Sequence, residues 1–288
     1  MANNIENQFL GNILATERKL TKAGDELLAY FKQKAEVKKP DLQSELMSFV
    51  NPEKGHTEED ILKDIKKVLR ARETASSRDH TDRGDMFEKL FEEFGEHFFK
   101  TTCSEIQLIK TGEYDDRIGS IDFILEGTKE DGKKFRVSID LTVSDNFDRT
   151  YSKTQKTITN ITQDGKLGEL KYGHFKNGEN RPRSVRAPRV VIALTSEQFD
   201  NLAELTLDVI KNNNASEIFS NSNFSKSFIR QMIGELEMQL SCIEESQSTI
   251  IERNNSDDQI GYNVYKKMLK TTQEALENIQ KIQKEKTP

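Results

Sequence analysis

Residues 136–146 read RVSIDLTVSDN, and this stretch decides the fold because a strand pattern there carries a carboxylate. Side chains on a β-strand alternate between its two faces. One face holds only apolar side chains, those of Val137, Ile139, Leu141 and Val143. The other face holds the polar side chains of Ser138, Asp140 and Thr142. Such a strand packs one side on a core and leaves the other for solvent or for a functional site.

The preceding segment, residues 118–126, reads as a second strand, and TKEDGKK at 128–134 predicts a hairpin between the two. The hydrophobic pattern fixes their register, because a slip by one residue would turn every side chain to the opposite face. A three-residue loop ending at Gly132 matches apolar with apolar residues, whereas a two-residue loop would place Leu141 opposite Asp122. We therefore predict the pairs Leu125–Val137, Phe123–Ile139, Ile121–Leu141, Ile124–Ser138 and Glu126–Arg136.

The same register places Asp122 directly opposite Asp140. The Cβ atoms of such a pair lie about 5 Å apart, and like charges at that distance destabilise a sheet. Protonation of one acid or a bound divalent cation relieves the repulsion, and carboxylate oxygens are ligands that Mg²⁺ prefers. The sequence therefore predicts a metal site at Asp122 and Asp140, with a solvent-exposed polar face as the alternative.

The segments around the hairpin predict an α/β core with helical flanks. A Phe-rich amphipathic helix is followed by three strands, a helix and a further strand, at residues 84–99, 104–110, 118–126, 134–143, 147–162 and 188–195. This order defines an α/β domain over 81–213. A helical region at 1–80 precedes it and a helical hairpin at 214–288 follows it.

Composition excludes several classes of protein. The net charge of −6 over 288 residues argues against general attraction to nucleic acid and leaves only a local basic patch. Cys103 and Cys242 lie too far apart in the sequence to suggest a disulfide framework or a metal cluster. The first residues lack a signal-peptide pattern, and no apolar run approaches the ~20 residues of a membrane span. We expect a cytoplasmic protein without a membrane segment.

The segment 172–189 supplies a local basic patch, with Glu179 as its one acid. Arg181, Arg183 and Arg186 are candidates for contacts with nucleic-acid phosphates, and a solvated surface loop is the alternative. His174 in the same loop is a weaker candidate for a general base.

The two C-terminal helices, at about 224–247 and 260–285, carry apolar residues at intervals of three and four. That spacing favours antiparallel packing within one chain, and a homodimer interface is compatible with it.

Three short motifs and the order of the elements resemble the PD-(D/E)xK nuclease superfamily, which has a restriction-endonuclease-like αβββαβ core. The resemblance covers residues 82–196. The matching residues are Gly84-Asp85-Met86-Phe87-Glu88, Arg117-Ile118-Gly119-Ser120-Ile121-Asp122-Phe123 and Ile139-Asp140-Leu141-Thr142.

The resemblance implies a phosphodiesterase that depends on Mg²⁺ or Mn²⁺. Asp122 and Asp140 would hold the metal, and Glu88 on the leading helix would bind it directly or through water. The implied function is a DNA endonuclease of the restriction or phage-defence type. The alternative is a catalytically inactive protein that keeps the fold and binds nucleic acid or a protein partner.

One position departs from the family pattern. Thr142 stands where the family has its motif lysine, so a lysine from the following helix would have to replace it. Lys153 and Lys156 are the candidates. Phe147, Tyr151 and Ile158 predict the buried side of that helix, and both lysines lie well away from it.

Overall fold

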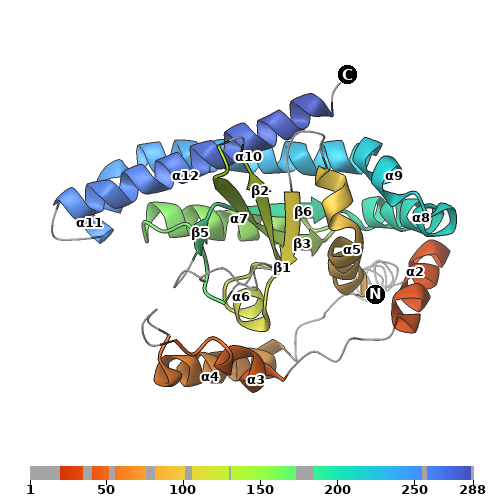
Figure 1. Ribbon diagram of the computed structural model, residues 1–288, viewed down its shortest axis with the longest axis horizontal. Coiled ribbons are helices and arrows are strands. Elements are labelled where there is room, and N and C mark those ends of the chain that lie inside the picture. Colours follow the sequence, from red (N-terminus) through yellow and green to blue (C-terminus); the bar gives the residue numbers. More distant parts are fainter. Residues whose placement is uncertain are drawn as a thin grey trace, which may run out of the picture.

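A small mixed sheet forms the centre of the fold (Figure 1). We describe a computed structural model over residues 20–34, 41–51, 56–75, 82–100, 106–129, 131–172, 185–254 and 258–286. The sheet has the order β1-β2-β3-β6, in which β1, β2 and β3 are antiparallel neighbours and β6 runs parallel to β3. Its strands are β1 (Ile106–Lys110), β2 (Phe123–Thr128), β3 (Lys134–Val143) and β6 (Arg189–Leu194).

Helices surround the sheet. Those before and within the core are α2 (Lys22–Gln33), α3 (Leu42–Met47), α4 (Glu58–Ala75), α5 (Asp82–Phe99), α6 (Glu113–Arg117) and α7 (Phe147–Thr162). Those that follow are α8 (Ser196–Asn212), α9 (Ala215–Asn221), α10 (Asn223–Glu245), α11 (Gln247–Asn254) and α12 (Asp258–Glu285). A second, two-stranded sheet pairs β4 (Gly168–Leu170) with β5 (Val185–Ala187). The chain is thus mixed α/β with helical flanks, as predicted.

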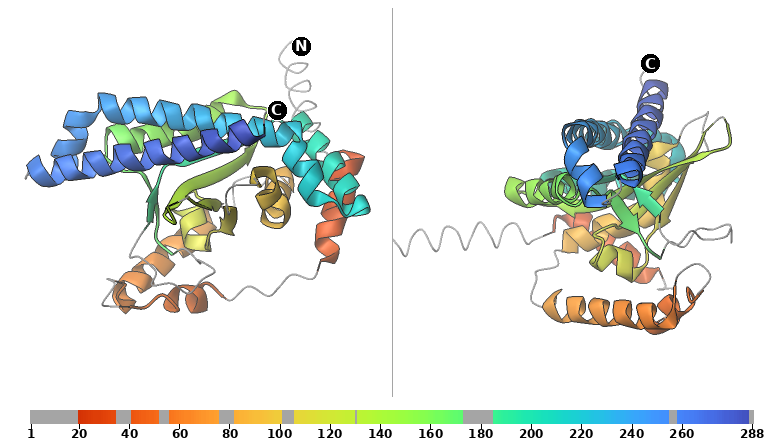
Figure 2. Two further views of the ribbon diagram at one scale, coloured as in Figure 1. Left: turned by 45° about the horizontal axis from the view of Figure 1, so that its top comes forward. Right: turned by 90° about the vertical axis from the view of Figure 1, so that its left-hand side faces the viewer.

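The largest hydrophobic cluster of the described residues joins the sheet to helices from both flanks. It lies on the apolar face of β3 and includes Phe87 and Phe91 of α5. Leu27 from α2, Met232 from α10 and Ile279 from α12 are buried in the same cluster. In Figures 1 and 2, α10 and α12 lie side by side along the sheet, while α3 and α4 lie at its other end, next to α6. Parts of all three predicted regions therefore contribute to one core.

The predicted register of the β2–β3 hairpin is confirmed from Phe123 to Thr128. Gly132 has a φ of 76°, the left-handed conformation that the predicted loop requires. The pairs Phe123–Ile139, Ile124–Ser138, Leu125–Val137 and Glu126–Arg136 are all formed. The alternation of apolar residues therefore sufficed to fix which face of β3 carries Asp140.

The prediction fails at the start of β2, where Ile121 was expected to pair with Leu141. The Asp122 N–H donates to the carbonyl of Ile139, the residue that also pairs with Phe123. Two consecutive residues thus oppose one, which is the arrangement of a β-bulge. Ile121 consequently packs in the cluster of Ile124 on the opposite side of the sheet.

Helix α10 covers the outer edge of β6 with three side chains. The three side chains lie four residues apart on α10, and the backbone groups that they bond lie two residues apart on β6. Four residues of a helix advance about 6 Å and two residues of a strand about 6.6 Å, so the two sets of groups stay aligned. The bonds are Gln239 Nε2 to the Arg189 carbonyl (2.6 Å), Val191 N–H to Glu235 Oε2 (3.0 Å) and Ala193 N–H to Gln231 Oε1 (2.9 Å). Alternate backbone groups of the edge strand are therefore paired.

We expect Gln239→Ala to lower the free energy of unfolding by about 1–3 kcal/mol, because it leaves the Arg189 carbonyl without its donor. Chemical denaturation of the two proteins measures the difference. Glu237→Ala, an exposed position on the same helix, is the control and should change stability little. Equal stability of Gln239→Ala and the parent protein would contradict the assigned bond.

No helix in the described parts of the chain is both long and apolar enough to cross a lipid bilayer.

Candidate metal centre

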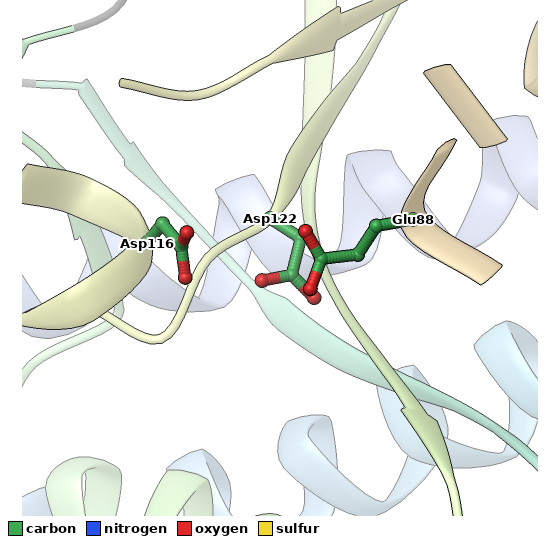
Figure 3. A group of neighbouring side chains, drawn as sticks. All are labelled: Glu88, Asp116 and Asp122. Atoms are coloured by element: carbon green, nitrogen blue, oxygen red, sulfur yellow. The ribbon is translucent and has the colours of Figure 1, made fainter. Parts of the chain in front are cut away.

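Three carboxylates from separate elements converge beside the start of β2 (Figure 3). Glu88 comes from α5, Asp116 from α6 and Asp122 from the bulge before β2. One oxygen of each lies within 4.8 Å of the others. Carboxylate oxygens at such distances fit a hard cation such as Mg²⁺ or Mn²⁺.

The bulge sets the position of Asp122. Leu141 N–H would bond to a carbonyl of β2 if the ladder continued, but it donates instead to Asp122 Oδ2 at 2.6 Å. The Asp122 side chain is thus held by backbone of β3 and is 6% exposed. A residue that the sequence pattern placed within a regular strand is therefore turned toward Glu88 and Asp116.

Asp116 was not among the predicted site residues. It lies on α6, between β1 and β2. A helix of five residues is too short to show a hydrophobic period in the sequence. The segment Glu113-Tyr114-Asp115-Asp116 begins directly after Gly112, and its run of acids was the available signal. The predicted metal ligands Glu88 and Asp122 are brought together, with Asp116 as the third member of the group.

Asp140 lies next to this group but its oxygens face cations. Lys153 Nζ donates to Asp140 Oδ1 at 2.7 Å, and Arg189 Nη2 donates to Oδ2. The Asp140 side chain is 3% exposed. The predicted direct pairing of Asp122 with Asp140 lies beyond the β2–β3 ladder, which ends at Phe123.

Burial dominates the electrostatics of the cluster. It raises the pKa of Asp122 well above the ordinary range, and the nearby carboxylates of Asp140 and Glu88 raise it further. Burial also raises the pKa of Asp116 to about 6, with Glu88 as the next contribution. Burial and the neighbouring carboxylates thus disfavour the charged forms of Asp122 and Asp116, and a bound divalent cation would favour them.

A lysine of β1 neutralises part of the cluster. Lys110 Nζ lies 3.2 Å from Glu88 Oε2 and 3.7 Å from Glu92 Oε2. Burial acts to lower the pKa of Lys110, but the carboxylates of Glu88 and Glu92 outweigh it, so that the pKa is raised. Among the described residues, Asp116 and Asp122 form no ion pair. Asp116 and Asp122 are therefore the two carboxylates of the cluster whose charge a bound cation would balance.

Lys153 lies toward the sheet, contrary to the helical-wheel interpretation. Phe147 is 77% exposed and Tyr151 is 52% exposed, so these aromatic rings do not mark the buried side of α7. Thr157 and Ile161 are the buried residues. Lys153 lies one turn before Thr157 on α7, and its Nζ also donates to the Leu141 carbonyl at 3.2 Å.

Lys156 lies one turn further along α7. Its Nζ is 3.4 Å from Ser120 Oγ, in the loop before Asp122. Burial lowers its pKa, and the positive charge of Arg189 contributes. In the part of the chain that the structure describes, Lys156 forms no ion pair, unlike Lys153.

The predicted basic loop is described only in part. Arg186 lies exposed on β5. Arg181, Arg183 and His174 fall outside the described residues, as does Cys103. The predicted phosphate contacts therefore stay predictions.

We expect cation binding to stabilise the protein, and more so at about pH 7.5 than at about pH 5.5. Asp116 and Asp122 have raised pKa values when folded, so the folded chain binds protons more tightly than the unfolded chain. Their contribution to stability is present at low pH and lost as pH rises through the folded pKa values. A cation competes with those protons and restores stability at the higher pH.

Thermal denaturation with EDTA or with Mn²⁺ at both pH values measures the difference. Asp115, whose pKa is raised to about 6 by burial, adds to the metal-free pH dependence, so the Mn²⁺-dependent shift is the informative quantity. Asp122→Asn is the control that should abolish it. A shift that is equal at both pH values would contradict the prediction.

Comparisons with protein-family models, with curated proteins and with solved structures find no match to this chain.

Proposed function

We propose that the chain is a nuclease that uses Mg²⁺ or Mn²⁺ to hydrolyse phosphodiester bonds, with DNA as its substrate. The observation that carries the proposal is the convergence of Glu88, Asp116 and Asp122, with Lys153 on the adjacent Asp140. Acids that hold a cation beside a positioned lysine suit the chemistry of phosphoryl transfer, which needs charge stabilisation more than covalent catalysis.

The architecture supports membership of the PD-(D/E)xK superfamily. An αβββαβ order is present in α5, β1, β2, β3, α7 and β6, with the short α6 inserted between β1 and β2 and the β4–β5 pair before β6. Asp122 directly precedes the second strand and Asp140 lies in the third, close to the positions that the resemblance assigns to the metal-binding acids. The proposed restriction-endonuclease-like core rests on this order and on these positions.

Glu88, Asp116 and Asp122 would hold the cation. A bound cation of this kind lowers the pKa of a water molecule and polarises a phosphoryl oxygen. Asp140 lies next to the cluster, and its negative charge contributes to the raised pKa of Asp122. The two carboxylate oxygens of Asp140 accept hydrogen bonds from Lys153 and Arg189. Asp140 would therefore affect the cation electrostatically and not as a direct ligand.

The two lysines of α7 have different proposed roles. Lys153 takes the place of the motif lysine that Thr142 replaces, and its ammonium group stabilises charge that develops on the phosphate. Lys156, beside Ser120, is placed to contact a non-bridging phosphate oxygen. Arg186, which is exposed on β5, remains a proposed contact for a nucleic-acid phosphate.

The test is incubation of the purified chain with plasmid DNA, linear DNA and RNA, with Mg²⁺, with Mn²⁺ and with EDTA. Cleavage of DNA that requires the cation and is lost in Asp140→Ala or Asp122→Asn supports the proposal. Cation-independent cleavage, or cleavage that survives in both variants, contradicts it.

The ion pairs of Asp140 with Lys153 and Arg189 favour one alternative function. In it, the chain keeps a nuclease fold, lacks catalytic activity and binds nucleic acid or a protein partner. Lys153 and Arg189 together neutralise a buried acid, which is also what a structural ion-pair network does. Binding of DNA without cleavage by any of the proteins tested would favour this alternative.

A further inference from the structure

We propose that α3 and α4 hold the proposed metal centre in shape, and that Asp64 and Arg72 of α4 are positioning residues for Asp116. This inference rests on the proposed function. It assigns a role in the site to a helical unit that forms its own small hydrophobic cluster away from the main core.

Helix α6 depends on its surroundings for its position. It has five residues, and isolated helices shorter than about 12–15 residues are marginal in water. Its N-cap residue, Gly112, makes no side-chain capping bond. The place of Asp116 is therefore set by what the other residues of α6 contact.

Each of the three residues before Asp116 is fixed by a different contact. Glu113 receives bonds from Arg72 of α4, with Nε to Oε1 at 2.6 Å, and from Arg117 at 2.6 Å. Tyr114 packs among the apolar residues of α3 and α4. Asp115 accepts the N–H groups of Lys171 and Tyr172 at 2.7 and 2.8 Å.

Asp64 ties α4 to the same 171–172 backbone. It is 2% exposed at its side chain and accepts the Tyr172 hydroxyl at 2.7 Å and the Lys171 ammonium group. The Tyr172 ring packs edge-on against the Tyr114 ring, with centroids 5.0 Å apart. Asp64 therefore holds the segment that Asp115 bonds, while Arg72 holds Glu113 directly.

These contacts fix the first three residues of α6 against α3, α4 and the 171–172 segment. Asp116 is the residue left to project toward Glu88 and Asp122 (Figure 3). A shift of α6 relative to α4 would move the Asp116 carboxylate away from the other two, which come from α5 and from the bulge before β2. Partners behind metal ligands typically contribute 10–100-fold to metal affinity.

The test is binding of Mn²⁺ to the full chain, measured by calorimetry. We expect Asp64→Asn and Arg72→Met to weaken Mn²⁺ binding by about tenfold while far-UV circular dichroism stays unchanged. Arg72→Lys, which keeps the charge next to Glu113, should recover part of the affinity. Lys66→Met, at an exposed position of α4, should bind as the parent protein does.

Ile61→Val separates a positioning role from general loosening. Ile61 is fully buried in the α3–α4 cluster, so its variant loses stability without touching α6 hydrogen bonds. We expect it to keep its Mn²⁺ affinity. Equal weakening by Ile61→Val and Asp64→Asn would overturn the inference, as would parent-like affinity of both Asp64→Asn and Arg72→Met.

Asp116→Asn distinguishes failure of this inference from failure of the proposed function. If Asp116→Asn binds Mn²⁺ weakly and the α4 variants bind normally, only the positioning role is wrong. If the parent protein and Asp116→Asn bind Mn²⁺ equally, or neither binds it, the metal centre itself is wrong and the positioning role falls with it.

Discussion

Replacing Asp122 with Asn is expected to reduce cation-dependent DNA cleavage by about a thousandfold, since several kcal/mol of charge stabilisation depend on the cation. Asn keeps the shape of the side chain and retains an oxygen that can accept the Leu141 N–H. The fold should therefore survive while the charge needed for the cation is lost. Initial rates of plasmid cleavage at saturating Mg²⁺ measure the effect.

Stability supplies an internal control for the same variant. Asp122 is a buried acid with a raised pKa, so removing its charge should raise, or leave unchanged, the melting temperature in EDTA at neutral pH. Asp148→Asn, an exposed acid on α7, should change neither activity nor stability. An Asp122→Asn protein that cleaves at the parent rate would exclude Asp122 from the site.

Replacing Lys153 with Met is expected to reduce cleavage by about a hundredfold or more, the loss seen when one group that stabilises developing charge is removed. Met has a similar length and no charge. Asp140 keeps its bond from Arg189, so the buried acid retains one cation. Mn²⁺ affinity should change much less than the cleavage rate, because Lys153 is not a metal ligand.

Two further variants make the Lys153 result specific. Lys153→Arg, which keeps a positive charge beside Asp140, should restore part of the activity. Lys166→Met, an exposed lysine just beyond α7, should have no effect. If Lys156→Met abolishes cleavage and Lys153→Met does not, the roles proposed for the two lysines are reversed.

The β2–β3 hairpin was predictable because its signals are local. Alternating apolar residues and one glycine sufficed for the β2–β3 register, and Gly132 has the left-handed conformation that the loop needs. Such features involve neighbours in the sequence, so that pattern and backbone geometry correspond directly.

The candidate site was predictable only in part because long-range contacts set it. Alternation cannot reveal a bulge, which is why Ile121 and Asp122 were assigned to a regular strand. Asp116 comes from a helix too short to produce a periodic pattern. Its place depends on Arg72 and on the 171–172 segment, which are distant in the sequence.

The orientation of α7 was mispredicted for a different reason. Phe147 and Tyr151 are four residues apart, the spacing of side chains on one face of a helix. Both are nevertheless exposed, and their rings stack on each other with centroids 5.9 Å apart. The side that faces the sheet instead carries Lys153 and Thr157. Polar side chains thus lie on the face that the helical wheel assigned to solvent.

The glutamine and glutamate side chains that α10 places along β6 also limit how this protein can associate. An uncovered strand edge is a template on which another chain can add a strand and so begin aggregation. Here Val191 and Ala193 offer their outward N–H groups to Glu235 and Gln231 instead. Growth of the sheet past β6 is blocked, and self-association on that side has to use helix surfaces.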